Sequence, residues 1–186
     1  MFKKKNTIAI LGVDGSGKST AVENVAKRYG DRCSVTYMGF TRFEDPRIES
    51  SETRRFSRPL RLYLIYRCFW KRYKKAVSIG QFALFDRYVH EIFINSRGGW
   101  YNNINVLLYK YFFPQPQIIV YLYCPAEESL RRKSDIPDPD KFIEMKERFD
   151  NFFLNKKHVM CIDSGKLSPD LIADKICAYI DQSFSK

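Results

Sequence analysis

Residues 12–19 read Gly12-Val13-Asp14-Gly15-Ser16-Gly17-Lys18-Ser19 and match the pattern G-x-x-x-x-G-K-[ST] of a phosphate-binding loop. The short apolar run 7–11 in front of them is typical of a buried strand. From residue 18 to residue 29 the spacing predicts a helix with Gly30 as its C-cap. The apolar face of this helix consists of Ala21, Val22, Val25, Ala26 and Tyr29. Because such a loop needs a strand before it and a helix after it, both flanks favour a phosphate-binding loop over a plain glycine-rich turn.

The residue types in this loop suit the binding of phosphate groups. The glycines let consecutive backbone N–H groups converge on phosphate oxygens at the positive end of the helix. The Lys18 side chain adds a mobile cation, and the Ser19 hydroxyl is a ligand for Mg²⁺. We therefore predict that the phosphates of a nucleotide bind through Gly12, Asp14, Gly15, Ser16, Gly17, Lys18, Ser19 and Thr20.

Strand and helix patterns alternate along the rest of the chain. Strands are expected at 33–38, 82–86, 117–123 and 158–163. Helices are expected at 59–79, from about 88 to the break at 97–99, and at 105–113, 125–133 and 139–154. A last helix should start at Ser168-Pro169, with Leu171, Ile172, Ile176, Tyr179 and Ile180 on its apolar face. This alternation is typical of an α/β fold whose parallel sheet is covered by helices on both faces.

The composition fits one domain spanning residues 1–186. With 186 residues, 45% of them hydrophobic, the chain can form a sizeable core. The five cysteines include no C-x-x-C pair, so we interpret them as reduced core thiols. Lys3, Lys4 and Lys5 precede an apolar run that is too short for a signal peptide, and no segment has the length of a membrane span. We therefore expect a cytoplasmic protein.

The net charge of +11 is concentrated in one part of the chain. Such an excess attracts polyanions, for example nucleotides, nucleic acids or anionic lipid headgroups. We favour the solvated face of an amphipathic helix as its explanation, and the alternative is a dedicated surface for nucleic acid or membranes. The basic residues are Arg54, Arg55, Arg58, Arg61, Arg67, Lys71, Arg72, Lys74 and Lys75.

A second group of polar residues follows the predicted strand 82–86. This strand ends in Asp86, and Arg87 and Tyr88 come next. Because ligands of open parallel sheets bind at the carboxyl ends of the strands, Asp86 and Arg87 should lie at the same edge as the phosphate loop. There a carboxylate can hold Mg²⁺ and a guanidinium can bind a phosphate with two hydrogen bonds. We therefore predict a role in the nucleotide site rather than a purely structural ion pair.

With these motifs the chain resembles the thymidylate kinase family of P-loop nucleoside monophosphate kinases. The resemblance rests on the core 14–19, on Asp86-Arg87-Tyr88, on Tyr121-Leu122-Tyr123 with Pro125 leading to Arg131, and on Cys161-Ile162-Asp163. These motifs occur in the family's order over nearly the whole chain. The resemblance implies the P-loop NTPase fold, in which three layers α/β/α enclose a five-stranded parallel sheet of order 2-3-1-4-5, with a short lid at about 131–140.

The resemblance also implies catalytic roles. In family members whose phosphate loop has no arginine, as here, the lid supplies the catalytic cations, so Arg131, Arg132 and Lys133 are the candidates. Cations that arrive with the lid can stabilise the charge on the transferred phosphoryl group. Lys18 and Arg87 would complete the catalytic set, while Ser19 and Asp86 would hold Mg²⁺.

On the acceptor side the resemblance implies contacts from a helix. Tyr63 and Arg67 have the spacing of an aromatic residue that stacks on the acceptor base and an arginine that contacts it. Asp14, Asp86 and Arg87 would complete the substrate site. The alternative is that Tyr63 belongs to the core of an aromatic-rich helix.

Two segments depart from the family pattern. The R-E-P turn is replaced by residues 37–42, in which Arg42 is the stand-in for the arginine that binds the acceptor phosphate. The A-Y-Q-G segment is replaced by residues 89–97, in which His90 is either a substrate contact or a packing residue. Both departures weaken the case for thymine recognition and leave the case for nucleotide-dependent phosphorylation intact.

We therefore predict an enzyme that uses ATP and Mg²⁺ to phosphorylate a nucleoside monophosphate, by default dTMP. The donor adenine should lie near residues 164–167. One alternative is a P-loop kinase that acts on a sugar- or lipid-linked acceptor, and another is a non-catalytic, nucleotide-gated protein that binds a polyanion. The expected partners are small nucleotides rather than nucleic acid, and the apolar stretch 105–113 would serve either the core or a homodimer interface.

Overall fold

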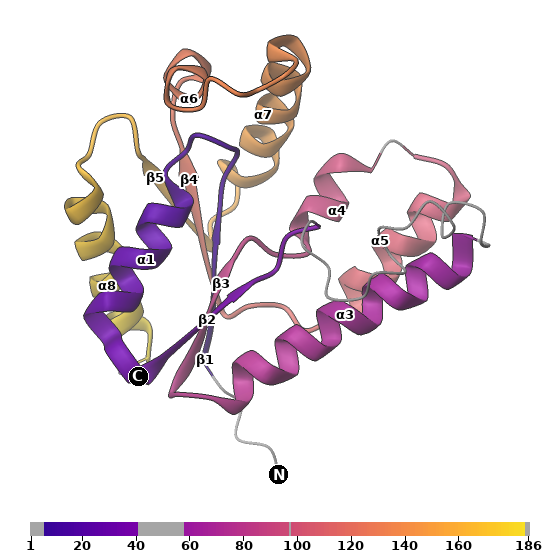
Figure 1. Ribbon diagram of the computed structural model, residues 1–186, viewed down its shortest axis with the longest axis horizontal. Helices are drawn as coiled ribbons and strands as arrows, with labels where there is room; N and C mark the ends of the chain where they lie inside the picture. Colours follow the sequence, from indigo (N-terminus) through magenta and orange to yellow (C-terminus); the bar gives the residue numbers. More distant parts are fainter. Residues whose placement is uncertain (1–5, 41–57, 97, 185–186) are drawn as a thin grey trace.

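A parallel sheet forms the centre of the protein (Figure 1). The computed structural model describes residues 6–40, 58–96 and 98–184. The sheet contains β1 (Asn6–Leu11), β2 (Cys33–Tyr37), β3 (Phe82–Asp86), β4 (Ile118–Tyr123) and β5 (Val159–Asp163), in the order β2-β3-β1-β4-β5. Each pair of neighbours is parallel. The predicted fold class and strand order are therefore confirmed, and the carboxyl ends of the strands lie at one edge.

Helices cover both faces of the sheet (Figure 1). One layer contains α1 (Lys18–Tyr29) and α8 (Pro169–Phe184), and a 3-10 turn (Gly30–Arg32) joins α1 to β2. The other layer contains α3 (Arg58–Ser78), α4 (His90–Asn95), α5 (Trp100–Phe112) and α7 (Pro139–Phe153). The short α6 (Ala126–Arg132) follows β4 at the carboxyl edge of the sheet.

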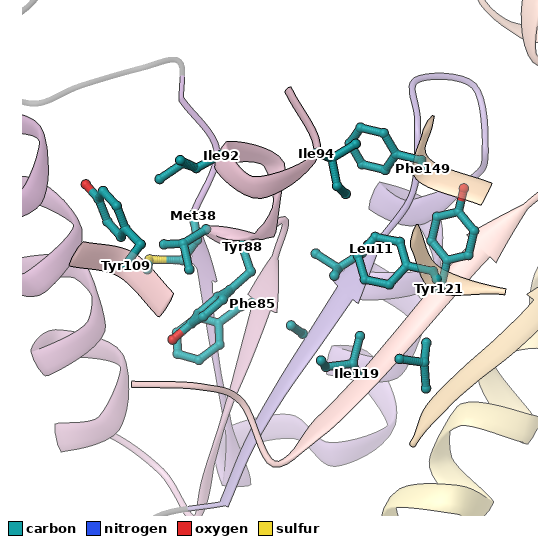
Figure 2. Close-up of a cluster of buried hydrophobic side chains, with 14 of the residues drawn as sticks. Leu11, Met38, Phe85, Tyr88, Ile92, Ile94, Tyr109, Ile119, Tyr121 and Phe149 are labelled. Atoms are coloured by element: carbon teal, nitrogen blue, oxygen red, sulfur yellow. The ribbon is translucent and has the colours of Figure 1, made fainter. Parts of the chain in front are cut away.

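The alternation of side chains along β1 divides the core into two clusters. Ile8 and Ile10 belong to the cluster beneath α1 and α8, whereas Ala9 and Leu11 belong to the cluster on the opposite face. Figure 2 shows part of this second cluster, in which residues from the sheet meet residues from α4, α5 and α7. Because both faces of the sheet are covered by apolar side chains, a polar site can form only at the ends of the strands, where the loops emerge.

Most predicted elements are confirmed to within two residues. The predicted helix 105–113 is wrong at its start, because α5 begins at Trp100. Gly98 and Gly99 have φ values of 78° and 87°, and the Asn102 side chain donates a hydrogen bond to the Gly98 carbonyl, so the helix starts directly after this turn. On α8 the predicted apolar face is wrong at one position. Leu171 is 51% exposed, and Ala173 is buried instead.

The basic helix α3 is amphipathic, as the favoured interpretation predicts. The side chains of Arg61, Arg67, Lys71, Lys74 and Lys75 are exposed. Arg72 is the exception, because it is buried and donates a hydrogen bond to the Gly39 carbonyl at 3.3 Å. The predictions that involve Arg42, Arg54 and Arg55 concern residues outside the described part of the chain.

The cysteines and the membrane prediction can also be compared with the structure. All five thiols are free; Cys124 is buried, and Cys33, Cys68, Cys161 and Cys177 are only half-buried, so the description as core thiols holds fully for Cys124 alone. Within residues 6–40, 58–96 and 98–184, no helix combines the length and the apolar character that crossing a bilayer requires.

Candidate active site

The phosphate loop lies between β1 and α1 and packs directly against α6. Gly15 has a φ of 78°, and a Cβ atom at this position would come within 2.4 Å of the Ser129 carbonyl oxygen. Glycine is therefore required both by the backbone conformation and by the close approach of α6. The N–H of Ser16 donates to the Val13 carbonyl at 3.2 Å, which closes the turn before α1.

The Asp14 carboxylate brings three cations together in this loop. Its Oδ1 accepts a hydrogen bond from Lys18 Nζ at 3.0 Å and forms an ion pair with the Arg87 guanidinium. Its Oδ2 accepts from Lys133 Nζ at 3.3 Å. The three cations come from the first turn of α1, from the residue after β3 and from the residue after α6. Residues that are far apart in the sequence thus meet around one carboxylate.

The charges of this cluster shift the pKa values of its members. Burial alone would raise the pKa of Asp14, but the charges of Lys18, Arg87 and Lys133 outweigh it and hold the pKa well below its usual range. Burial and the nearby charge of Arg87 lower the pKa of Lys18, against the opposing effect of Asp14 and Asp86. Asp14 is therefore ionised at neutral pH, and an additional anion beside Lys18 and Arg87 would be stabilised.

Arg87 has an unusual backbone conformation. Its φ of 65° lies in the left-handed region, which a residue with a Cβ atom occupies at a cost of about 1–3 kcal/mol. Its N–H donates to the Ile10 carbonyl at 3.1 Å, and its Nη1 donates to Glu91 Oε1 at 2.6 Å. These contacts hold the guanidinium between the phosphate loop and α4. Burial would lower its pKa, but the carboxylates of Glu91 and Asp14 raise it.

Gly39 makes room for the Arg87 side chain. A Cβ atom on Gly39 would lie 2.7 Å from Arg87 Cδ and 2.2 Å from the Tyr37 hydroxyl. The N–H of Met38 donates to the Asp86 carbonyl at 2.8 Å, so the segment after β2 continues alongside β3. The described part of the segment that replaces R-E-P, residues 37–40, therefore lies against Arg87.

Asp86 and Ser19 provide oxygen atoms at the edge of the sheet. Asp86 is the last residue of β3, and its charge favours the protonated form of Lys18. Ser19 is exposed in the first turn of α1. The described ranges contain no group of three or more His, Cys, Asp or Glu residues that could hold a metal ion. Mg²⁺ in phosphoryl-transfer sites needs only one or two protein oxygen ligands beside the phosphates, so Ser19 and Asp86 fit this ion.

A cavity of about 200 Å³ lies where β5 ends, close to the start of α1. Arg132 closes one side of it by donating a hydrogen bond to the Ser164 carbonyl at 3.1 Å. Ser164 in turn is fixed by the Tyr123 carbonyl, which accepts from the Ser164 N–H at 2.8 Å. The lining residues are Gly17, Thr20, Ala21, Arg132, Ser164, Leu167, Pro169 and Ile172. Ser164 and Leu167, from the segment predicted to lie near the donor adenine, line this cavity.

The three candidate lid cations have different surroundings. Lys133 reaches Asp14 and hence the phosphate loop. Arg132 pairs with Glu128 at 2.8 Å and faces the cavity at the end of β5. The side chain of Arg131 is 76% exposed and pairs with the same Glu128. The structure thus brings Lys133 and Arg132 to the site and leaves Arg131 outside it.

A second cavity, of about 330 Å³, opens on the other side of Arg87. Among the described residues that line it, Glu91 is the one that carries a charge. The lining residues are Phe40, Glu91, Ile92, Asn95, Ser96, Asn102 and Asn105. The sequence analysis did not select Glu91, although an acidic residue four positions after a strand-end arginine lies one helical turn away and can pair with it.

The remaining predicted substrate contacts lie elsewhere. Tyr63 is 56% exposed on α3, which contradicts the alternative that it belongs to the core, and Arg67 is exposed as well. Neither is among the described residues that line the two cavities. His90 is a packing residue, because it is buried between the rings of Phe93, Phe152 and Phe153.

Comparison with known proteins supports the fold. No protein-family model matches the sequence, and no match is found among curated proteins. Three solved structures of deoxyadenosine kinase from M. mycoides are similar, each with a TM-score of 0.65 and with sequence identities of 18%, 17% and 16%. They cover 95%, 94% and 95% of this chain, and 99% of the kinase chain in each case. Two of them contain dATP and dCTP, and the third contains the products dCMP and dCDP. The chain therefore has the fold of these P-loop kinases.

Proposed function

We propose that the protein is a P-loop kinase, formed by residues 1–186 as one domain, that transfers the γ-phosphoryl group of ATP to a nucleoside-type acceptor. The observation that carries this proposal is the cluster of Lys18, Arg87 and Lys133 around Asp14, between two cavities. In this proposal the cavity at the end of β5 would take the donor base, and the cavity beside Glu91 would take the acceptor. The free thiols and the use of ATP fit a cytoplasmic location.

The donor would bind across the phosphate loop. Its base would enter the cavity beside Ser164 and Leu167, and the backbone N–H groups at the start of α1 would meet its phosphates. Lys18 would then give up its hydrogen bonds to Asp14 and to the Val13 carbonyl, the latter of 3.1 Å. It would bind phosphate oxygens in their place. Because the Lys18 side chain is buried and has lost most of its water, a phosphate anion at this position is a stronger partner than the remaining solvent.

Ser19 and Asp86 are the residues that would hold Mg²⁺. When bound, the ion neutralises charge on the donor phosphates. The protein's own contribution at the γ-phosphoryl group would come from Lys133, after α6, and from Arg87, after β3, which both contact the Asp14 carboxylate. Both can shift from this carboxylate to equatorial phosphoryl oxygens, where charge accumulates in a loose transition state. Lys133 is therefore our choice among the lid cations.

The described lining of the second cavity favours a neutral acceptor. A nucleoside monophosphate brings about two negative charges, which need cationic partners. The described lining of the cavity offers amides, a hydroxyl and the Glu91 carboxylate, which suit hydroxyl groups and base edges. In the similar kinase the product dCMP is a nucleoside with one phosphate group. We therefore propose a deoxynucleoside as the acceptor, ahead of dTMP, which was the default acceptor in the sequence analysis.

When the acceptor is a hydroxyl group, the reaction must also remove the proton of that group. As the acceptor oxygen bonds to the γ-phosphorus and the bridging bond to ADP breaks, the hydroxyl proton must leave. Glu91 lines the acceptor cavity, and a single guanidinium, that of Arg87, bridges it to Asp14 of the phosphate loop. Glu91 is therefore the residue that we propose to accept this proton.

An acceptor screen tests the proposal. ADP formation would be measured with ATP and Mg²⁺ in the presence of deoxyadenosine, deoxycytidine, thymidine, dTMP, other nucleoside monophosphates and sugar phosphates. We expect ADP with at least one deoxynucleoside and little without an acceptor. Turnover with a sugar phosphate and with none of the other acceptors would change the proposed acceptor class. The assignment as a kinase would stand. Binding of ATP without turnover for any acceptor would favour the non-catalytic alternative.

A further inference from the structure

The three cations at the phosphate loop share an anion that belongs to the protein itself. Asp14 Oδ1 accepts a hydrogen bond from Lys18 Nζ at 3.0 Å and pairs with the Arg87 guanidinium. The other oxygen, Asp14 Oδ2, lies 3.3 Å from Lys133 Nζ. The side chains of Lys18 and Arg87 are only 7% and 21% exposed. Because little water reaches these two cations, their attraction to Asp14 is screened less than in a surface ion pair.

The contacts of Lys18 show how this carboxylate competes with a phosphate group. The ammonium group of a lysine has three N–H donors. In Lys18 one is directed to Asp14 Oδ1 and another to the Val13 carbonyl, at 3.0 and 3.1 Å. An ionised carboxylate only accepts hydrogen bonds and repels a second anion, so it cannot become a phosphate ligand. A phosphate group that approaches Lys18 therefore has to share or replace the contacts of Asp14.

The negative charge of Asp14 does not depend on mild changes of pH. Burial would raise the pKa of this carboxyl group, but the charges of Lys18, Arg87 and Lys133 hold it well below its usual range. The charge is thus a fixed part of the loop, and a substitution at position 14 is the means to remove it.

We infer that the Asp14 carboxylate is a specificity determinant of the phosphate loop: it excludes small inorganic phosphates, so that only a donor with a base displaces it. The inference rests on the proposed function, since it takes the loop as the donor site. Inorganic pyrophosphate can replace the contacts of Asp14 only through its own charge. A nucleotide gains further contacts in the cavity at the end of β5, which Arg132, Ser164 and Leu167 help to line. A charge that disfavours the wrong ligand is a general means of discrimination.

Calorimetric titration with inorganic pyrophosphate tests the inference without an acceptor and without turnover. The full chain would be titrated in the absence of Mg²⁺ and at constant ionic strength, because added salt screens the charges concerned. The wild type should bind pyrophosphate with a Kd weaker than about 1 mM. Asp14→Asn should bind at least about tenfold more tightly, since Lys18, Arg87 and Lys133 then meet an anion without a competing carboxylate.

Three further variants assign the effect to the charge at this place. Asp14→Glu keeps the charge and should keep the weak binding of the wild type. Glu23→Gln removes a negative charge from α1, where Glu23 is 64% exposed and pairs with Lys27, and should also bind as weakly as the wild type. Adding Lys18→Ala to Asp14→Asn should abolish the gained binding, which would locate it at the phosphate loop.

Circular dichroism and thermal unfolding would show that each variant is folded. Asp14→Asn leaves three cations without their shared carboxylate, and repulsion among them lowers stability. If this variant does not fold, the double variant Asp14→Asn with Lys133→Gln takes its place. It removes one charge of each sign, keeps Lys18 and Arg87, and should still bind pyrophosphate more tightly than the wild type.

Several results would overturn the inference. One is equal or weaker binding of pyrophosphate by Asp14→Asn, which would leave Asp14 as an anchor for Lys133 or as an acceptor contact. Another is an equal gain in Glu23→Gln, which would assign the effect to net charge alone. A failure of the proposed function is a separate result. A protein without ADP formation can still gain pyrophosphate binding in Asp14→Asn, and an active kinase can lack this gain.

Discussion

Asp14 and Arg87 stand 73 positions apart in the sequence and form an ion pair at the carboxyl edge of the sheet. The pair joins the loop after β1 to the residue after β3. Because Lys18 and Lys133 share the same carboxylate, one anion determines the position of three cations. In our account the transferred phosphoryl group takes over these partners during the reaction.

Lys133→Ala should lower kcat by about 100-fold or more, because it removes a cation that stabilises the charge on the transferred phosphoryl group. The matched control is Arg131→Ala, two residues earlier, whose side chain points to solvent. Its kcat should stay within about threefold of wild type. Steady-state ADP release checks both variants. Equal losses for the two variants would show that Lys133 has no special position at the site.

Glu91→Gln should lower kcat/KM for a deoxynucleoside by about 100-fold or more, since the isosteric amide cannot accept the hydroxyl proton. The Kd for ATP, measured by calorimetry, should change little. Glu127→Gln on α6 is the control, because this carboxylate is exposed. Wild-type turnover by Glu91→Gln across the pH range would remove Glu91 from the mechanism.

Gly15→Ala should cost more stability than Gly17→Ala in the same loop. Both glycines have a positive φ, 78° and 79°, and alanine in the left-handed region costs about 1–2 kcal/mol. A Cβ atom on Gly17 meets open space, whereas one on Gly15 would overlap the Ser129 carbonyl and push α6 away from the loop. An additional loss of about 1–3 kcal/mol is expected for Gly15→Ala. Chemical denaturation measures both values, and equal values would contradict the close approach of α6.

His90 should make the protein sensitive to mild acid. Burial, with added repulsion from Lys156 and His158, lowers the pKa of His90 from 6.5 to about 4. As the pH falls, the unfolded chain takes up this proton near pH 6.5 and the folded protein only near pH 4. The free energy of unfolding should therefore fall over this interval, by at most about 3 kcal/mol, and the contribution should be constant above it.

His90→Phe should remove this part of the pH dependence, because phenylalanine fits among the surrounding aromatic rings and does not titrate. His158→Gln is the control: it removes the exposed second histidine and should keep most of the pH dependence, because burial is the largest cause of the His90 shift. Urea denaturation at pH 7 and pH 5 measures the difference. A wild-type pH dependence in His90→Phe would show that other groups cause it.

The alternation of strands and helices, and with it the parallel α/β sheet, could be predicted from the sequence. Buried parallel strands are short apolar runs, and the residues that follow them are fixed to one edge by the topology. This is why the placement of Asp86 and Arg87 beside the phosphate loop could be predicted without a structure. The N-cap at Asp138, whose Oδ1 accepts from the Lys141 N–H, is a local signal of the same kind.

The remaining features depend on contacts that no local pattern records. Arg131, Arg132 and Lys133 are consecutive and chemically alike, and only the end of α6 determines which of them meets Asp14. The outward apolar face of α5 also has a helical period, which reads equally well as a core face. The structure shows that this face points outward, because Tyr109, on the opposite side of α5, is buried.

The central claim is tested most directly by ADP formation from ATP and Mg²⁺ with the wild-type protein and with Lys18→Ala, in the presence of each deoxynucleoside and of dTMP. We expect acceptor-dependent ADP formation by the wild type, faster with a deoxynucleoside than with dTMP, and a loss of about 100-fold or more in Lys18→Ala. A wild-type protein that forms no ADP with any acceptor and shows no calorimetric binding of ATP and Mg²⁺ would contradict the account.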